Sequence, residues 1–514
     1  MSKEMGSEKL GEFYTGGKIR KRREWRGLKD TWYDYTRWLF IWRQLIGFTL
    51  KPINIKGSLR YRWMVNYLAV PDFLDRHTEG LRGTQLRIAH TEFDLIVEHM
   101  CDTLSTTFKA DTRIGGDKEL SKKIVVFDEN MMSQIMNGFP NLHMICMQLA
   151  PIYTGSTMAQ DGVIHYIDVA QEYGIPGDVC PMPAAELGVA IDDDYPIIGK
   201  CAVQCNTTCD GSLMGNGLEA RRFKIPTFQL AAPIRHTQEG VQEYAAEEIK
   251  NAISFIEEQT GEKFDWDNFF KCMDTFNNET KQFLEWLELS RSPYPQVIGN
   301  NVALYRCAAY QVAGGRDARF LEAEEKITKL AMEGYEKKSL CVPEVRHRAV
   351  LWGVQAQYYT AFPLWLQNCW GVLSLIDMLS LTSTRIFDIG DKDQDQALLD
   401  LAHLYMNMTM RNRSNGGYEV GLNDLWRFCD YFNADMVIMY EHIGCKAMGG
   451  YHGLFEEQAR ERGIHLVWVT HGLMDPRNAS RRDMRTEVNR YMRSVLRAEP
   501  LDPSLEDFDD KYAF

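Results

Sequence analysis

From about residue 120 onward, short hydrophobic runs alternate with longer segments of helical periodicity. Short apolar runs bounded by turn residues are typical of buried strands. They fall at residues 123–127, 201–206 and 225–230 and, after a helical stretch, at 349–354, 371–376, 436–440 and 464–469. Strands that alternate with helices predict βαβ units and a parallel sheet. We therefore predict two parallel-sheet segments with helices between them.

Helical spacing is clearest in the middle of the chain. Val241, Ala245 and Ile249 recur at intervals of four residues, which places them on one helical face. Gly261 has the residue type that commonly ends a helix, and Asp265 can cap the next one. A long helical segment is therefore expected between the two sheets.

These patterns divide the chain into five segments. They are an N-terminal basic and aromatic helical extension (1–118), a first α/β domain (119–236), a helical segment (237–345), a second α/β domain (346–500) and an acidic tail (501–514). The predicted fold class is α/β, with two Rossmann/flavodoxin-like parallel-sheet domains, a helical middle segment and an N-terminal helical extension.

The N-terminal extension differs in character from the rest. A basic run at residues 18–29 leads into aromatic residues that include Trp32, Trp38 and Trp42. Such a segment could lie on a membrane as an interfacial amphipathic helix. It could also pack on a partner subunit, because aromatic residues and Arg are enriched in interface cores. We favour the partner interface, since the remaining chain has the pattern of a cytosolic oligomer.

Composition narrows the class of protein. The net charge of −13 argues against general nucleic-acid binding, which needs a basic surface. We see no apolar run long enough to span a membrane and no signal segment, so we expect a cytoplasmic protein.

Twelve cysteines in such a chain are a poor match for a disulfide framework. Cys101, Cys272, Cys307 and Cys429 sit in helix-like apolar patterns and are expected to be small buried residues.

Three other cysteines lie in loops where this fold builds sites. Cys209 follows the strand at 201–206, Cys445 follows the strand at 436–440, and Cys180 closes the turn at 174–180. Ligands of open parallel sheets bind outside the carboxyl ends of the strands. Thiolates there favour iron–sulfur clusters, zinc or copper(I), and the helix N-termini that follow would stabilise them. The spacing contains no Cys-x-x-Cys pair, so it leaves open whether a metal binds.

Four motifs in order resemble one known family. They are GIPGDVC at 174–180, Cys209 followed by a helix and RRFKIP at 221–226, EHIGC at 441–445, and DPR at 475–477. Over about residues 120–497 the sequence resembles the 2-hydroxyacyl-CoA dehydratase and benzoyl-CoA reductase family. The resemblance implies a 4Fe–4S cluster held by Cys180, Cys209 and Cys445, in an oxygen-sensitive enzyme that adds low-potential electrons to a CoA thioester.

The resemblance also implies partners. Such enzymes pair two homologous subunits around the acyl-CoA substrate and receive electrons from a separate ATP-hydrolysing iron–sulfur activator. The sequence shows no G-x-x-x-x-G-K-[ST] loop, which agrees with ATP hydrolysis on another protein.

The sequence departs from the family pattern at two places. Residues 354–358 carry no cysteine where many relatives have a Cys-Trp pair, so Cys205 and Cys201 are candidates for a fourth ligand. Residues 152–156 read IYTGS where dehydratase-type subunits tend to carry Tyr-Pro-Glu-Asn. We therefore favour a benzoyl-CoA-reductase-like reductase of aromatic acyl-CoA. The alternatives are an (R)-2-hydroxyacyl-CoA dehydratase subunit acting through a ketyl radical, and a non-catalytic electron-relay or structural subunit, the last including a zinc protein.

Two residues beside Cys445 are candidates for proton transfer. His442 lies three residues before that cysteine and could deliver a proton or donate to a cluster sulfur; alternatively it is a loop histidine bonded to backbone. Glu441 is a possible acid, although loop carboxylates usually face water.

Overall fold

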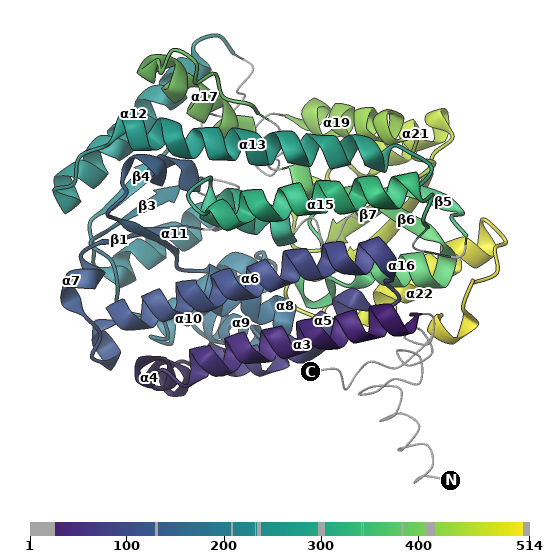
Figure 1. Cartoon of the computed structure of the whole chain (residues 1–514), viewed down its shortest axis with the longest axis horizontal. Helices are drawn as coiled ribbons and strands as arrows, with labels where there is room; N and C mark the ends of the chain where they lie inside the picture. Colours follow the sequence, from purple (N-terminus) through teal and green to yellow (C-terminus); the bar gives the residue numbers. More distant parts are fainter. Residues whose placement is uncertain are drawn as a thin grey trace, which may run out of the picture.

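The computed structural model describes residues 26–128, 132–206, 209–231, 233, 238–296, 304–340, 342, 344–381, 385–407 and 417–506. Within them the chain forms two four-stranded sheets covered by helices (Figure 1). The N-terminal basic run falls mostly outside the described residues, and so does the acidic tail after residue 506.

Both sheets are parallel throughout and have the same strand order. The first contains β1 (Ile124–Phe127), β2 (His143–Cys146), β3 (Cys201–Cys205) and β4 (Thr227–Leu230) in the order β2-β1-β3-β4. The second contains β5 (His347–Trp352), β6 (Val372–Asp377), β7 (Met436–His442) and β8 (His465–His471) in the order β6-β5-β7-β8. The predicted α/β fold with two parallel sheets is confirmed.

Only β2 was missed from the sequence, because its four residues include a single β-branched side chain, Ile145. The other seven strands fall within about two residues of the predicted ends, the usual disagreement at element boundaries.

Helices follow the strands in both halves. In the first they are α9 (Ile164–Glu172), α10 (Pro181–Ile191), α11 (Asp210–Phe223) and α12 (Val241–Thr260), and in the second α16 (Phe362–Trp370), α17 (Gln394–Asn407), α19 (Tyr418–Phe432), α20 (Lys446–Gly449), α21 (His452–Arg462) and α22 (Arg481–Ser494). Gly261 ends α12 in the left-handed conformation, and the Asp265 side chain accepts the Asn268 amide at the start of α13 (Trp266–Ser290), as the sequence predicts.

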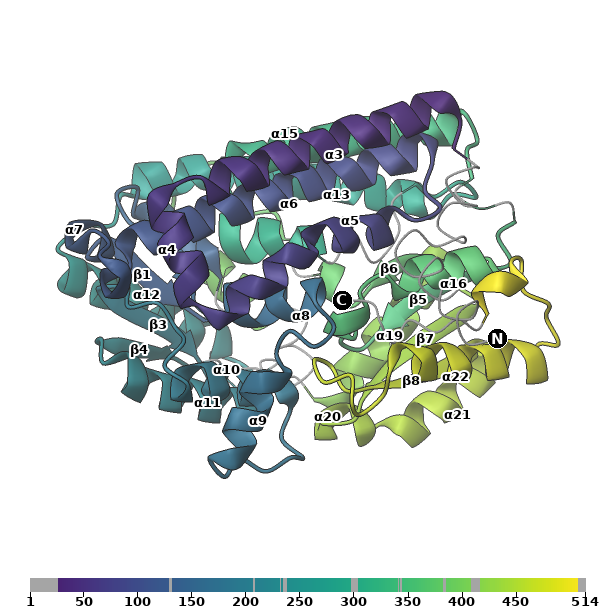
Figure 2. The same cartoon turned by 90° about the horizontal axis from the view of Figure 1, so that it is seen from below.

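A layer of long helices crosses both sheets (Figures 1 and 2). Its members are α3 (Leu28–Thr49) and α6 (Gly83–Ala110) from the N-terminal part, with α13 and α15 (Ala318–Glu336) from the middle of the chain. They pack in the order α3, α6, α15, α13. The N-terminal extension and the helical middle segment therefore form one layer in space, and the domain limits drawn from the sequence remain a prediction.

The N-terminal part is completed by α4 (Pro52–Arg60), the 3₁₀ helix η1 (Arg62–Ala69) and α5 (Val70–Thr78). None of the described helices has the length and apolar character that crossing a bilayer requires.

Candidate functional site

The two sheets place Cys209 and Cys445 at equivalent positions. In each sheet the third strand in chain order, β3 or β7, pairs with the first, β1 or β5. Cys209 follows β3 and Cys445 follows β7. The order in which successive strands are added to the sheet reverses between these two strands, and open α/β sheets bind ligands at such a switch point. Each sheet therefore presents one cysteine at the place where a ligand is expected.

All three candidate cysteines are N-cap residues of helices. Cys180 precedes α10, Cys209 precedes α11 and Cys445 precedes the short α20. The free N–H groups and positive dipole end of a helix stabilise a negative charge at this position. These cysteines therefore occupy the places on their helices where a thiolate is most easily held.

The structure brings the three thiols together. Burial raises the pKa of the Cys180 thiol, the Met182 backbone amide opposes this shift, and the Cys209 and Cys445 thiols raise the pKa further. An effect of this kind requires the other two sulfurs to lie near Cys180. Cys209 is exposed, whereas Cys180 and Cys445 are partly buried.

Close packing of α10 on α11 holds Cys180 near Cys209. A Cβ atom added at Gly211 would lie 3.3 Å from Pro183 Cγ and 3.6 Å from Cys209 Sγ. At Gly215, one turn later, an added Cβ would lie 3.1 Å from Glu186 Oε2 and 3.5 Å from Pro183 Cβ. The two glycines therefore form the flat strip on α11 against which α10 packs.

Two ion pairs link the Cys180 side of the site to the second sheet. Lys446 Nζ lies 3.2 Å from Asp178 Oδ2. Lys446 directly follows Cys445, and Asp178 is two residues before Cys180. Arg477 Nη1 lies 2.7 Å from Asp168 Oδ1 on α9. The Lys446–Asp178 pair is largely exposed, so it adds little stability but favours the approach of the two loops.

His442 contacts Cys180 directly. Its Nε2 lies 3.2 Å from Cys180 Sγ, and its Nδ1 is 3.3 Å from the Gly444 amide. In the tautomer with the proton on Nε2, the ring donates to the sulfur while Nδ1 accepts the Gly444 amide. Burial lowers the pKa of His442 to about 4, so the ring is neutral at neutral pH.

Gly444 allows this contact. A Cβ there would lie 3.2 Å from Cys180 Cα and 3.0 Å from His442 Cε1, closer than ordinary packing permits. Behind His442, the buried His471 ring stacks on it with 5.6 Å between ring centroids. Cys180, His442 and His471 therefore form one packed group between the sheets.

Glu441 lies on the other side of β7. Its Oε1 is 3.2 Å from His452 Nδ1, and its Oε2 accepts the Thr470 hydroxyl at 3.3 Å. Neighbouring side chains of a strand point to opposite faces, so Glu441 and His442 cannot both face the thiols. The structure thus brings His442, but not Glu441, to the cysteines.

Cys205 also points away from the three thiols. It is fully buried at the end of β3, on the same strand face as Cys201 and Val203, within the core that includes Ile249 of α12. Its backbone amide donates to Asp128 Oδ2 at 2.5 Å, and its thiol donates to Asp128 Oδ1 at 3.5 Å. The structure does not bring Cys205 to the site, contrary to its place as a candidate ligand.

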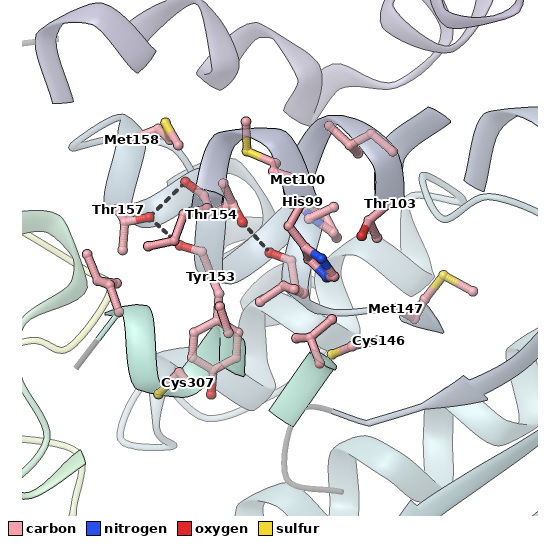
Figure 3. Close-up of a pocket in the computed structure, with 18 of the residues that line it drawn as sticks. His99, Met100, Thr103, Cys146, Met147, Tyr153, Thr154, Thr157, Met158 and Cys307 are labelled. Carbon is pink, nitrogen blue, oxygen red and sulfur yellow. Dashed lines mark hydrogen bonds between the residues drawn. The ribbon is translucent and has the colours of Figure 1, made fainter. Parts of the chain in front are cut away.

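An apolar cavity of about 170 Å³ lies beside the site (Figure 3). Its wall combines α6 (His99, Met100, Thr103), the end of β2 (Cys146, Met147), the π-helical turn η4 (Leu149–Thr154) with α8 (Gly155–Met158), and Cys307 before the π-helical turn η5 (Ala308–Ala313). Asp128 after β1 and Gln355 after β5 also reach it. The cavity therefore lies at the carboxyl ends of both sheets.

Tyr153 connects this cavity to the cysteines. It lines the cavity (Figure 3). Its hydroxyl lies 2.8 Å from Met182 Sδ, two residues after Cys180. Thr157 Oγ1 donates to the Tyr153 carbonyl at 3.0 Å and fixes the turn. From the sequence, residues 152–156 stand out only because they lack a family motif. Cys307, predicted to be a small buried residue in a helix-like apolar pattern, forms part of the cavity wall. Hydrophobic periodicity cannot detect a π-helical turn, yet such turns recur at functional sites.

The chemistry of the donor set fits an iron–sulfur cluster. Within the described residues, no three His, Cys, Asp or Glu side chains converge closely enough to hold one metal ion. Three soft sulfur donors on helix N-termini are the ligand type such a cluster takes.

Fold and site together define an α/β protein with two parallel sheets. Each sheet carries a cysteine in the loop at its switch point. A family model described as 2-hydroxyglutaryl-CoA dehydratase, D-component, matches residues 140–493. The chain belongs to this family.

The alpha subunit of (R)-2-hydroxyglutaryl-CoA dehydratase from Acidaminococcus fermentans is 26% identical to the chain over 157 residues. That alignment covers 29% of the chain and 32% of the subunit, about a third of its length. These matches favour the dehydratase alternative over the benzoyl-CoA reductase that we favoured from residues 152–156.

Proposed function

We propose that the chain is the iron–sulfur subunit of a 2-hydroxyacyl-CoA dehydratase, a lyase that removes water from a CoA thioester. The observation that carries the proposal is the close approach of three loops from distant parts of the chain. An added Cβ at Gly444, next to Cys445, would lie 3.2 Å from Cys180 Cα, and one at Gly211 would lie 3.6 Å from Cys209 Sγ and 3.3 Å from Pro183 at the start of α10. Family membership and the adjacent apolar cavity support it.

Cys180, Cys209 and Cys445 would hold a 4Fe–4S cluster between the sheets. When bound and reduced, such a cluster supplies a low-potential electron for the thioester carbonyl. The chain contributes helix N-termini that stabilise the thiolates and a His442 N–H directed at Cys180 Sγ. The raised pKa of Cys180 makes loss of its thiol proton costly, and the positive charge of bound iron would offset that cost.

The cavity would take the acyl part of the substrate. Its volume is below the range of about 300–1,000 Å³ usual for whole drug-sized ligands, so it suits a short acyl chain rather than a complete CoA ester. Met100, Met147 and Met158 supply a polarizable apolar wall, and Thr103 and Gln355 supply polar groups that can orient a carbonyl or hydroxyl oxygen.

Partners follow from the proposed chemistry. Cys209 is exposed, and the neighbouring Ile443 and Leu213 are 54% and 47% exposed, which leaves an apolar surface around the thiols. A homologous second subunit and an ATP-hydrolysing iron–sulfur activator would cover this surface in turn. Covering it would exclude water from the site during electron transfer.

The first test is anaerobic purification followed by iron and sulfide analysis and electron paramagnetic resonance of the reduced protein. We expect a brown protein with about four irons per chain, the content of one such cluster. Cys445→Ala should lose most of the iron. Cys205→Ala should retain it, because its thiol faces Asp128. Cys272→Ala is the matched control, since this cysteine is also partly buried but lies on α13.

Two outcomes would contradict the proposal. A colourless protein containing zinc would show a structural metal site, and full iron content after Cys445→Ala would remove that ligand. If the cluster is present, the complex with its partner subunit and activator distinguishes the reactions by mass. A dehydratase converts a 2-hydroxyacyl-CoA into a product lighter by one water. A reductase adds two hydrogens to an aromatic acyl-CoA. An electron-relay subunit, assayed without its partner, converts neither substrate.

A further inference from the structure

Half of the large hydrophobic side chains that are exposed in the described residues lie between Leu28 and Leu68. On α3 they are Leu28, Trp32, Tyr35, Leu39, Trp42 and Ile46, all between 46% and 91% exposed. Alternating intervals of four and three residues place these six side chains on one face of the helix. The exposed apolar residues then continue through Leu50, Ile55, Leu59, Val65 and Leu68 along α4 and η1.

A different face of α3 packs inward. Asp34, Ile41 and Phe48 are buried, and α3 contacts α6 along this side. A surface helix of a globular protein usually has one apolar stripe facing the core and a polar opposite face. Since α3 has a second apolar stripe, its outer face has the character of a contact surface. We call the exposed side of α3, α4 and η1 the outer face.

The charges of this segment are strongly biased. Residues 26–70 contain eight Lys and Arg but only two acidic residues, whereas the whole chain has a net charge of −13. Both acidic residues turn inward: Asp30 pairs with Arg87, and Asp34 pairs with Arg26 and His90. The cations Lys29, Arg43, Lys51 and Lys56 remain exposed, and residues 18–23 add five more to the chain just before α3.

Three protein occupants fit this surface poorly. A second copy would bring the same excess of cations against itself. The family match begins at residue 140, so it does not include α3, α4 and η1 and gives no support for a homologous subunit on this surface. A single partner helix could cover α3 but not α4 as well, because α4 turns away from the α3 axis (Figure 2). A broad anionic surface remains the best match in both charge and extent.

We propose that the outer face docks the protein on the surface of an anionic membrane. Trp32, Tyr35 and Trp42 have the amphipathic rings that settle at the headgroup level, and the leucines around them enter the acyl boundary. The exposed lysines and arginines contact lipid phosphates. Apolar insertion and a basic cluster are the two signals that together give stable peripheral attachment.

Vesicle flotation of the full-length protein tests the proposal. We expect binding to vesicles of phosphatidylglycerol and phosphatidylcholine at low salt, with affinity at least about tenfold weaker for phosphatidylcholine alone and in high salt. Trp32→Glu with Leu39→Glu should reduce binding by at least about tenfold, because it places two charges in the inserted stripe. Lys29→Glu with Arg43→Glu should abolish the preference for anionic lipid.

The matched control is Tyr244→Glu with Val495→Glu, two side chains of similar exposure on other parts of the surface, which should bind like the wild type. Circular dichroism and gel filtration of each variant exclude misfolding, since all the changed side chains are exposed or partly so. Absence of vesicle binding by the wild type overturns the proposal, as does equal binding by the stripe variant and the control. If the wild type ignores vesicles and the stripe variant alone loses a co-purifying acidic protein, the outer face is a protein interface instead.

Discussion

Cys180 Sγ and His442 Nε2 lie 3.2 Å apart at the junction of the two sheets. Cys180 caps α10 in the first half of the chain, and His442 is the last residue of β7 in the second. Through this contact, the surroundings of the Cys180 thiol in the first half depend on the position of the His442 ring in the second half. It therefore connects the relative placement of the two sheets with the electronic surroundings of a sulfur that we propose as a cluster ligand.

His442→Phe should lower the reduction potential of the reconstituted protein by tens of millivolts without loss of iron. A hydrogen bond to a ligand sulfur stabilises the more negative, reduced state, and phenylalanine keeps the ring that packs on His471 but cannot donate. Redox titration followed by electron paramagnetic resonance measures the shift. His452→Phe is the control, because His452 stacks on Trp468 away from the thiols. An unchanged potential in His442→Phe would mean that the ring does not donate to the sulfur.

Gly444→Ala should reduce iron incorporation several-fold in a protein that still folds. The added methyl group would meet Cys180 Cα at 3.2 Å and His442 Cε1 at 3.0 Å, so the two loops must separate. Gly449→Ala is the matched control in α20, since nothing lies within 4 Å of its added Cβ. Iron analysis and circular dichroism of both variants are the measurements. Equal iron content in the two would show that the loops need not approach this closely.

Much of this arrangement was accessible from the sequence, for a physical reason. Seven strands are marked by apolar runs, and the ends of parallel strands are where loops collect at one edge. Cys209 and Cys445 could thus be placed near an edge without coordinates. Their nearness to Cys180 could not be derived, because it depends on how α10 packs on α11 through Gly211 and Gly215.

Where the structure places predicted site residues elsewhere, the causes are equally physical. The sequence ranked Glu441 and His442 together because they are adjacent, whereas strand geometry sends adjacent side chains to opposite faces. Cys205 was a candidate by proximity to Cys209, yet it shares a face with Cys201 that packs against α12. The cavity was missed because residues from α6, η4 and the segment before η5 meet only in the folded chain.

Two glycines of α11, Gly215 and Gly217, should differ sharply in how well they tolerate a larger side chain. Gly215→Val adds bulk where even a Cβ would lie 3.1 Å from Glu186 Oε2, so we expect about 1–3 kcal/mol of destabilisation and lower iron content. Gly217→Ala, on the same helix with nothing within 4 Å of its Cβ, should stabilise the protein by up to about 1 kcal/mol through helix propensity. Urea denaturation compares the two. Similar stability of both variants would contradict close packing of α10 on α11.

Glu279 should make the stability of the protein fall as pH rises from about 5 to 8. Glu279 is buried on α13. The cation of this core, Arg306, is paired with Glu324 instead, with 2.7 Å between Nη1 and Oε1. Burial, reinforced by Glu324, raises the pKa of Glu279 to about 8 from its ordinary value of 4.5. The folded protein therefore holds a proton that the unfolded chain releases above its ordinary pKa, and each further unit of pH costs about 1.4 kcal/mol until the folded pKa is reached.

Glu279→Gln removes this dependence while keeping the shape of the side chain. We expect similar urea midpoints for variant and wild type near pH 5, and a higher midpoint for the variant at pH 8, equivalent to a few kcal/mol. Glu285→Gln, an exposed position on the same helix, should follow the wild type at both pH values. Because burial also raises the pKa values of Glu92 and Glu324, some decline with pH should persist in the variant. Parallel curves for Glu279→Gln and wild type across this range would mean that Glu279 is already ionised in the folded protein.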